Sequence, residues 1–281
     1  MSTPSLTYAS PDDSLLRAGL IRAIEALTGR RHLERLYART APPESDTFFW
    51  ASAIDQLDVT PQYAPDRLEA VPRSGPLVVV ANHPYGVLDG LVLCHLVSRV
   101  RPDFRVLVNS VLCRDDRIDI HTLPVDFQDT AAARRTNRRT IRTALATLNG
   151  EGAVLVFPAG GIATAPTPFG RAEDLPWKPL AATLVQSTEA TVAPMYVAGQ
   201  ASRLFQCASQ VSQTLRLSLV IREVVRNVGD TVPVRIGAPR AYDALPHPDD
   251  RAALTQHLRA LTLSLGDTPR TSGEGTSSAR N

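Results

Sequence analysis

The chain has 281 residues, enough for one large domain or two small ones with a proper hydrophobic core. Hydrophobic residues make up 43% and charged residues 21%, a balance typical of globular rather than disordered proteins. The 30 basic residues nearly balance the 28 acidic ones, and 29 of the basic residues are arginine, with Lys178 the only lysine. No GK[ST] sequence occurs, which excludes a Walker-type phosphate loop, and Schiff-base chemistry would have to use Lys178.

The three cysteines, Cys94, Cys113 and Cys207, are too few and too scattered for a disulfide framework or a zinc site. They fit a reducing compartment. The first residues lack the basic region of a signal peptide, and no window approaches 18 consecutive apolar residues. We therefore expect no transmembrane helix, and any membrane role is expected to be peripheral.

The N-terminal part of the chain has a helical pattern. Leu16, Leu20, Ile24 and Leu27 recur at helical spacing and predict an amphipathic helix over residues 14–40, which Gly29 breaks or bends. A second helix is predicted over 45–57, followed by an irregular linker that contains several prolines.

From residue 75 onward, short apolar runs alternate with helical stretches. The runs predict buried strands over 77–81, 104–108, 153–157, 191–197 and 232–237. Helices are predicted near 90–100, 132–148, 178–188, 206–227 and 251–266. This alternation indicates an α/β fold with a mostly parallel central sheet flanked by helices. The predicted organisation is an N-terminal helical segment (1–74) packing on an α/β domain (75–266), with a disordered tail (267–281).

The strongest local feature is ANHPYGVLDG, residues 81–90, which follows directly on the strand LVVVA. In α/β sheets, ligands gather beyond the carboxyl ends of the strands, where His83 falls. A turn at Gly86 would bring Asp89 back to His83 and form a general base with a carboxylate that orients it. The alternative is that Asp89 only caps the following helix and that His83 is a hydrogen-bonded loop residue.

Here the sequence resembles the phospholipid and glycerol acyltransferase superfamily, whose hallmark is an Asn-His-x4-Asp motif. NHPYGVLDG is most similar to the bacterial hemolysin-annotated and lyso-ornithine-lipid acyltransferase branch. FPAGGIATA (157–165) looks like the family's FPEG block, and VAPMYVAGQASRLF (192–205) looks like its fourth block. The segment 106–126 takes the place of the second block. The blocks follow one another in the family's order over roughly residues 15–240.

The sequence departs from the family pattern at three places, of which the last two concern the acceptor. Five residues, not four, separate His83 from Asp89; Ala159 replaces the glutamate of FPEG; and Phe127 stands where the second block has an arginine. The resemblance implies that the FPEG block and the second block hold the acceptor's phosphate in the glycerol-phosphate enzymes. The loss of their charged residues favours another hydroxylated amphiphile as acceptor, such as a lyso-aminolipid of the ornithine-lipid type.

The resemblance implies an O-acyltransferase that moves a fatty acyl group from acyl-CoA or acyl carrier protein to a hydroxyl group, with no other cofactor and no metal. His83 would be the base and Asp89 its holder. Backbone N–H groups of Gly160 and Gly161 are the candidates for binding the oxyanion. The residues expected to bind substrate are Asn82, Asn109, Arg114, Phe157, Pro158, Ala159, Gly160, Gly161, Ser202 and Arg203.

Arginines 134, 135, 138, 139 and 142 form a basic stripe on one predicted helix. The stripe fits lipid headgroups or the acidic face of acyl carrier protein, and a solvated outer face is the alternative. Nucleic acid is not expected as a partner, because net charge is near zero and no binding module is present. The predicted location is cytoplasmic, at the inner face of the cytoplasmic membrane.

Two other functions stay open at this point. A lipid-binding relative that has lost catalysis is consistent with Ala159 and with the longer His–Asp spacing. A thioester or lipid hydrolase, in which His83 activates water, needs the same base and no acceptor.

Overall fold

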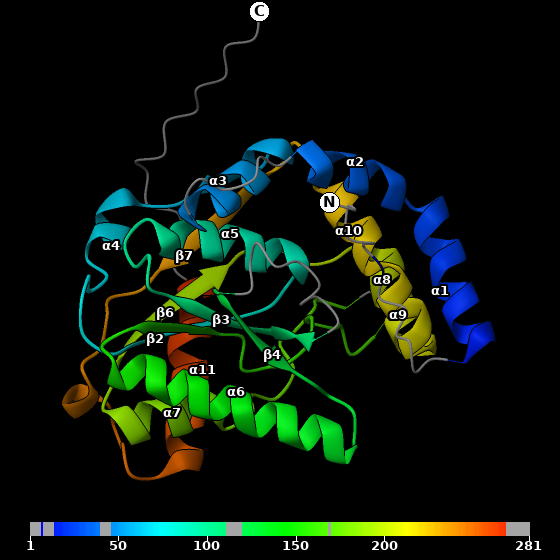
Figure 1. Cartoon of the computed structure of the whole chain (residues 1–281). Coiled ribbons are helices and arrows are strands. Elements are labelled where there is room, and N and C mark those ends of the chain that lie inside the picture. The colour runs from blue at the N-terminus through cyan, green and yellow to red at the C-terminus, as the bar shows by residue number, and fades with distance from the viewer. Residues whose placement is uncertain (1–6, 8–13, 40–45, 111–119, 168–169, 268–281) are drawn as a thin grey trace, which may run out of the picture.

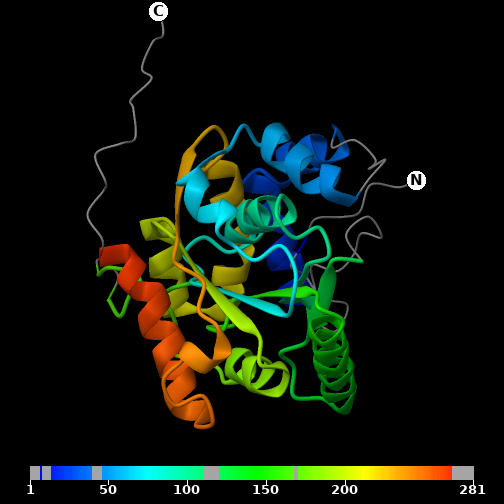
Figure 2. The same ribbon diagram turned by 90° about the vertical axis from the view of Figure 1, so that its left-hand side faces the viewer.

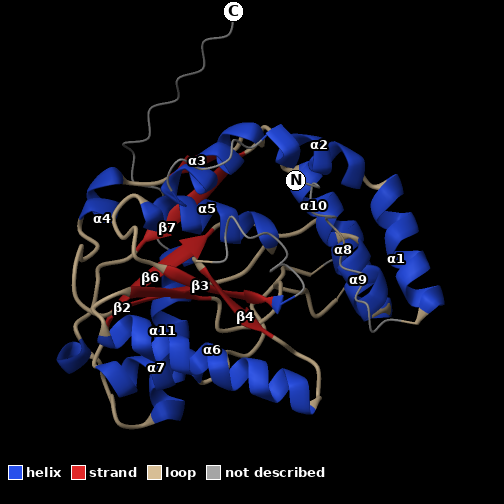
Figure 3. Cartoon of the chain, in the orientation of Figure 1, coloured by secondary structure: helices blue, strands red, loops and turns tan. Residues whose placement is uncertain are grey.

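The computed structural model describes residues 7, 14–39, 46–110, 120–167 and 170–267. Its centre is a seven-stranded sheet in the order β1-β7-β6-β2-β5-β3-β4 (Figures 1 and 3). The strands are β1 (Thr60–Gln62), β2 (Leu77–Ala81), β3 (Arg105–Asn109), β4 (Thr122–Val125), β5 (Ala153–Val156), β6 (Thr191–Val197) and β7 (Thr231–Ile236). Strands β2 to β6 run parallel to one another, and β7 is antiparallel to β6. The mostly parallel α/β fold is therefore confirmed.

Helices cover both faces of the sheet. Strand β2 is buried at every position, and its successive side chains enter two different cores. Leu77, Val79 and Ala81 face the core under α3 (Asp46–Gln56) and α5 (Val87–Ser98). Three other helices cover the core on the opposite face, namely α6 (Ala131–Asn149), α7 (Leu180–Thr188) and α11 (Arg251–Ser264). Figure 2 shows them in its lower half, in green, yellow-green and red-orange. A sheet covered on both faces explains why its strands are continuous apolar runs.

A helical group stands to the side of the sheet toward which the arrowheads of β3 and β4 point (Figure 1). It combines two distant parts of the chain, since α1 packs on α9 and α2 on α10. Its helices are α1 (Leu15–Leu27), α2 (Arg30–Arg39), α8 (Arg203–Val211), α9 (Gln213–Ser218) and α10 (Val220–Arg226). A short helix, α4 (Pro65–Glu69), precedes β2.

The single long helix predicted over 206–227 is wrong, because three short helices replace it. Ser212 is extended (φ −160°, ψ 132°), and its hydroxyl accepts a hydrogen bond from the backbone N–H of Thr214. Serine favours this capping role over an interior helical position. The chain therefore ends α8 and starts α9 at this residue.

The N-terminal segment departs from the prediction in one respect. The predicted break at Gly29 is confirmed, since α1 ends before it and its φ is +109°. However, Thr60–Gln62 forms an edge strand that pairs with β7, so this segment also contributes to the sheet. Strand β4 was likewise not predicted. The predicted tail lies outside the described residues except for Asp267. Among the described residues, no helix is long and apolar enough to cross a membrane.

Arg101 ties together three connections at the amino ends of the strands. Its side chain is fully buried and forms two hydrogen bonds with the carboxylate of Asp103, at 2.9 and 2.7 Å. It also donates to the backbone oxygens of Pro72, Gly75 and Glu151. Arginine suits this position because its planar fork presents several donors at fixed angles.

Replacing Arg101 should therefore destabilise the fold. We expect Arg101→Met to lower the free energy of unfolding by about 3 kcal/mol at pH 7, because buried oxygens lose their donors. The exposed Arg139→Met is the matched control and should change it by less than about 0.5 kcal/mol. Urea denaturation measures both values, and equal losses would contradict this role of Arg101.

The difference in the free energy of unfolding between wild type and Arg101→Met should depend on pH. The hydrogen bond from Arg101 lowers the pKa of Asp103 below its ordinary value. The stability that this hydrogen bond contributes is fully present above the pKa of an unfolded aspartate, about 3.9. It is lost as the pH falls through the lower pKa of Asp103 in the folded protein. The difference between wild type and Arg101→Met should accordingly narrow below about pH 4.

Candidate active site

The residues of the ANHPYGVLDG motif lie where β2 leaves the sheet. Asn82 is buried and joins this loop to β6, because its side chain donates to the oxygen of Val197 at 2.9 Å and accepts from the N–H of Val197 at 2.7 Å. Both functional atoms of the amide are thus used by one backbone position. Asn82 holds the loop against the neighbouring strand.

His83 and Asp89 are brought together. Nδ1 of His83 lies 3.1 Å from Oδ2 of Asp89, whose side chain is fully buried. The same carboxylate oxygen accepts hydrogen bonds from the backbone N–H groups of Tyr85 (2.8 Å) and Gly86 (2.9 Å). Neither Nδ1 of His83 nor Oδ1 of Asp89 has an aligned hydrogen bond to a described residue. The pair is in contact at hydrogen-bond distance, and Asp89 also caps the start of α5.

A left-handed turn absorbs the longer spacing between these two residues. Gly86 has a φ of +86°, and a Cβ atom there would lie 2.6 Å from Cδ1 of Ile162. Any other residue would be strained in this conformation and would collide with Ile162. In addition, the backbone oxygen of His83 accepts from the N–H of Ala163 at 2.8 Å. The FPAGGIATA segment therefore packs directly on the histidine loop.

Asp174 is a further carboxylate at the site, and sequence reasoning did not identify it. Its side chain accepts from the backbone N–H of His83 at 3.0 Å and from Nε1 of Trp177 at 2.8 Å. Burial raises the pKa of Asp174, and the hydrogen bond from Trp177 acts in the opposite direction. Asp174 lies in the proline-containing stretch between FPAGGIATA and α7, where no periodicity marks it.

A cavity of about 580 Å³ opens beside His83. Most of its wall is apolar and comes from α2, α3, α5, α10 and β3. Representative lining residues are Leu36, Trp50, Leu91, Val108 and Ile221. Burial in this wall raises the pKa of Cys94 well above its ordinary value. The cavity is therefore suited to an apolar chain that ends near an imidazole.

The ring of His83 lies against Phe157, with centroids 4.4 Å apart. Of the predicted substrate-binding residues, Asn109, Phe157, Pro158, Gly160 and Gly161 line the cavity. Four others do not line it, namely Asn82, Ala159, Ser202 and Arg203. Arg114 lies outside the described residues.

The proposed oxyanion donor needs a correction at one position. The backbone N–H of Gly160 donates to the oxygen of Phe157 at 3.0 Å, so this group is already used by the turn. The N–H of Gly161 makes no hydrogen bond to a described residue, and Gly161 lines the cavity. Of the two glycines, only Gly161 keeps a donor for a ligand.

The fourth block (192–205) packs against the loop that carries His83. Gly199 has a φ of +123°, and a Cβ atom there would lie 1.8 Å from the hydroxyl of Tyr85. The N–H of Ala201 donates to the oxygen of Pro84 at 3.1 Å. Ser202 caps α8 and is bound through its N–H and hydroxyl by the buried carboxylate of Glu223. These residues act on the site through packing.

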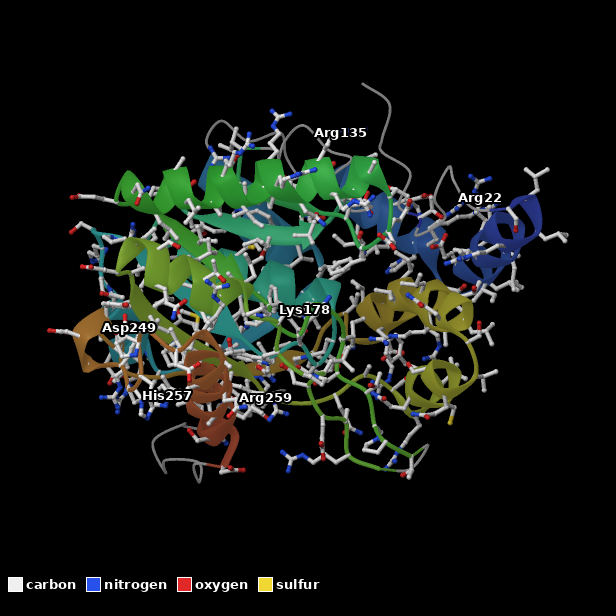
Figure 4. All side chains as sticks on the ribbon, turned by 90° about the horizontal axis from the view of Figure 1, so that it is seen from below. Arg22, Arg135, Lys178, Asp249, His257 and Arg259 are labelled. Atoms are coloured by element: carbon white, nitrogen blue, oxygen red, sulfur yellow. The ribbon has the colours of Figure 1, made fainter. Side chains whose placement is uncertain are left out.

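The cavity also holds cationic groups. Lys178 and Arg216 line it together with His83, and no aspartate or glutamate does so among the described residues. Figure 4 shows Lys178 between the helices α6 and α7 on one side and α8 and α9 on the other. No group of three His, Cys, Asp or Glu side chains in the described parts of the chain is arranged to hold a metal ion.

Comparison with known proteins places the chain in a family. Residues 40–240 match the model of a family described as "Acyltransferase", which is more than half of the chain. The chain belongs to this acyltransferase family and is an acyltransferase enzyme.

Two individual proteins are similar to it. A lyso-glycine lipid O-acyltransferase of Phocaeicola vulgatus is 24% identical over 208 residues, which cover 70% of this chain and 71% of that protein. The crystal structure of the 1-acyl-sn-glycerophosphate (LPA) acyltransferase PlsC from Thermotoga maritima has a TM-score of 0.49 and 16% identity, and covers 90% of this chain and 88% of that one.

Removing the Asp174 carboxylate should loosen the histidine loop. We expect Asp174→Ala to lower the free energy of unfolding by about 2 kcal/mol, because two buried donors lose their acceptor. The backbone amide of His83 should also exchange its hydrogen faster. The adjacent, exposed Glu173→Ala is the control, since Glu173 bonds to Thr164 through its backbone alone. Hydrogen exchange and urea denaturation test both variants; unchanged protection of His83 would refute this role.

Proposed function

We propose that the protein transfers a fatty acyl group from an acyl thioester, on CoA or acyl carrier protein, to the hydroxyl group of a lysolipid. His83 is the general base in this proposal. The observation that carries it is the 3.1 Å contact between His83 and the buried Asp89 beside a largely apolar cavity. A base with a fixed carboxylate partner, next to room for an acyl chain, matches the needs of this reaction.

In the proposed mechanism, Nδ1 of His83 faces Asp89, so Nε2 is the nitrogen that takes the hydroxyl proton. The hydroxyl oxygen attacks the thioester carbonyl carbon, and the resulting oxyanion accepts a hydrogen bond from the N–H of Gly161. Collapse of this intermediate breaks the carbon–sulfur bond. The departing thiolate takes the proton from the imidazolium of His83, which restores the base. Nδ1 of His83 is not well aligned with the carboxylate of Asp89. Hydrogen bonds of catalytic groups often become short and well aligned only when the substrate is bound.

The acceptor in this proposal is a lyso-aminolipid. The similar protein from Phocaeicola vulgatus is named for a lyso-glycine lipid, and this chain has Ala159 and Phe127 where the glycerol-phosphate enzymes carry charged residues. Lyso-ornithine lipid belongs to the same chemical class of acceptor. A hydroxyl group and a headgroup without phosphate are common to both.

We also propose that the protein works as a peripheral protein at the inner face of the cytoplasmic membrane. On α1, Leu15, Leu16 and Leu27 have 93%, 88% and 88% of their surface exposed, which an interfacial helix would bury in lipid. The arginines at 135, 138, 139 and 142 are exposed along α6, on which Figure 4 marks Arg135. This stripe suits anionic headgroups or acyl carrier protein.

The central test is acyl transfer by the purified protein from acyl-CoA or acyl carrier protein to a lyso-aminolipid. His83→Ala should remove nearly all turnover, and Asp89→Asn should lower kcat by about 10²–10⁴-fold, since the base loses its oriented partner. His257→Ala, on α11 and away from the cavity, should keep wild-type activity. Circular dichroism checks that the variants are folded, and full turnover by His83→Ala would refute the mechanism.

The same assay separates the two other functions. Release of free fatty acid at a rate independent of acceptor identifies a hydrolase. Binding to liposomes without transfer or hydrolysis, unaffected by Asp89→Asn, identifies a lipid-binding relative without catalysis.

A further inference from the structure

We propose that Lys178 and Arg216 form a binding site for the acidic group of the acceptor, over the turn at Gly160–Gly161. The ligand class is a lysolipid whose headgroup carries a carboxylate. The inference rests on the proposed function and names the part of the substrate that this end of the cavity recognises. It also assigns a role to the single lysine of the chain.

Lys178 is held over this turn by its surroundings. Its backbone N–H donates to the oxygen of Pro158 at 2.9 Å, which fixes the residue beside the segment that follows β5. Its Nζ lies 4.7 Å from the ring centroid of Phe127, a cation–π contact that positions the ammonium group. A Cβ atom on Gly160 would lie only 3.1 Å from Nζ, so the ammonium occupies the space that the glycine leaves open.

Arg216 approaches the same turn from α9. Its Nη2 donates to the oxygen of Ile162 at 2.7 Å, and its guanidinium lies 5.8 Å from the ring of Phe205. A Cβ atom on Gly161 would lie 3.5 Å from Nη2. The two cationic groups therefore flank consecutive glycines of one turn. A guanidinium held in this way keeps further N–H donors for a carboxylate.

The local charge balance favours an anion at this place. Neither Lys178 nor Arg216 forms an ion pair with a described residue, and no acidic side chain lines the cavity among the residues described. Burial lowers the pKa of Arg216, which reflects the cost of a charge withdrawn from water. A bound carboxylate would offset that cost by direct hydrogen bonds.

The position also fits the geometry of the reaction. Phe157 precedes the turn by three residues and lies against the imidazole of His83, so the base and the cations share one end of the cavity. A headgroup held at Lys178 and Arg216 would keep its nearby hydroxyl within reach of His83. We expect the acidic group of the acceptor to be the part that is recognised, and the phosphates of the donor are the alternative anion that the test must exclude.

The test compares two acceptors of nearly the same shape, one with a charged carboxylate and one with a neutral amide: N-(3-hydroxypalmitoyl)glycine and the corresponding glycinamide. For Lys178→Met we expect the KM of the carboxylate acceptor to rise about tenfold, with kcat within about twofold. The glycinamide should show the same KM with both proteins. Lys178→Arg should recover most of the affinity, and the exposed Arg171→Met, in the same connecting segment, should behave as wild type.

A second arm tests the donor as the source of the anion. Acyl-CoA is compared with the acyl thioester of N-acetylcysteamine, which has no phosphate. If Lys178→Met raises the KM of acyl-CoA but not that of the phosphate-free thioester, the site serves the donor and the inference is overturned. An equal change for carboxylate and amide acceptors, or no change for either, overturns it as well.

Equilibrium binding keeps this inference separate from the proposed function. Without any donor present, the carboxylate lipid should bind the wild type about tenfold more tightly than Lys178→Met, whereas the amide should bind both equally. Selective binding without acyl transfer by the wild type would refute the proposed function and leave the anion site standing. Transfer without this selectivity would refute the anion site alone.

Discussion

The buried carboxylate of Asp89 is the constraint on which the rest of the site depends. A carboxylate with no exposed surface needs donors in place of water. Two of them are the N–H groups of Tyr85 and Gly86, which point at it only because Gly86 adopts a φ of +86° and α5 begins at the next residue. The same turn places the imidazole of His83 at 3.1 Å. The start of α5, the turn at Gly86 and the contact between His83 and Asp89 are thus one arrangement.

That turn would not hold its shape alone, and three distant segments support it. Asn82 ties it to β6 by two hydrogen bonds, Asp174 binds the N–H of His83, and Ile162 fills the space beside Gly86. Sequence blocks that are more than 70 residues apart therefore act as one packing unit. They meet because β2, β5 and β6 are parallel, so that their carboxyl ends lie at one edge of the sheet.

The parts of this arrangement that have a periodic or apolar signal could be predicted from sequence. The runs LVVVA and TVAPMYV coincide with β2 and β6, and the His–Asp motif was recognisable from its place after a strand. Other parts depend on single contacts that have no local pattern. The Ser212 hydroxyl caps the start of α9 by a single hydrogen bond, and Asp174 reaches the backbone N–H of His83, which lies far from it in the sequence. The N–H of Gly160 was expected to face a ligand, yet the turn itself uses it.

The alanine at position 159 suits its buried surroundings. Position 159 is 2% exposed and packs in the core beneath α7, so a glutamate there would place a charge among apolar side chains. The described wall of the cavity, which does not include position 159, contains no acid, and Lys178 and Arg216 stand over two glycines. Gly160 leaves room for the single lysine of the chain, since a Cβ atom there would lie 3.1 Å from Nζ of Lys178. Two cations with no acid beside them in the described wall favour the binding of an anion at this end of the cavity.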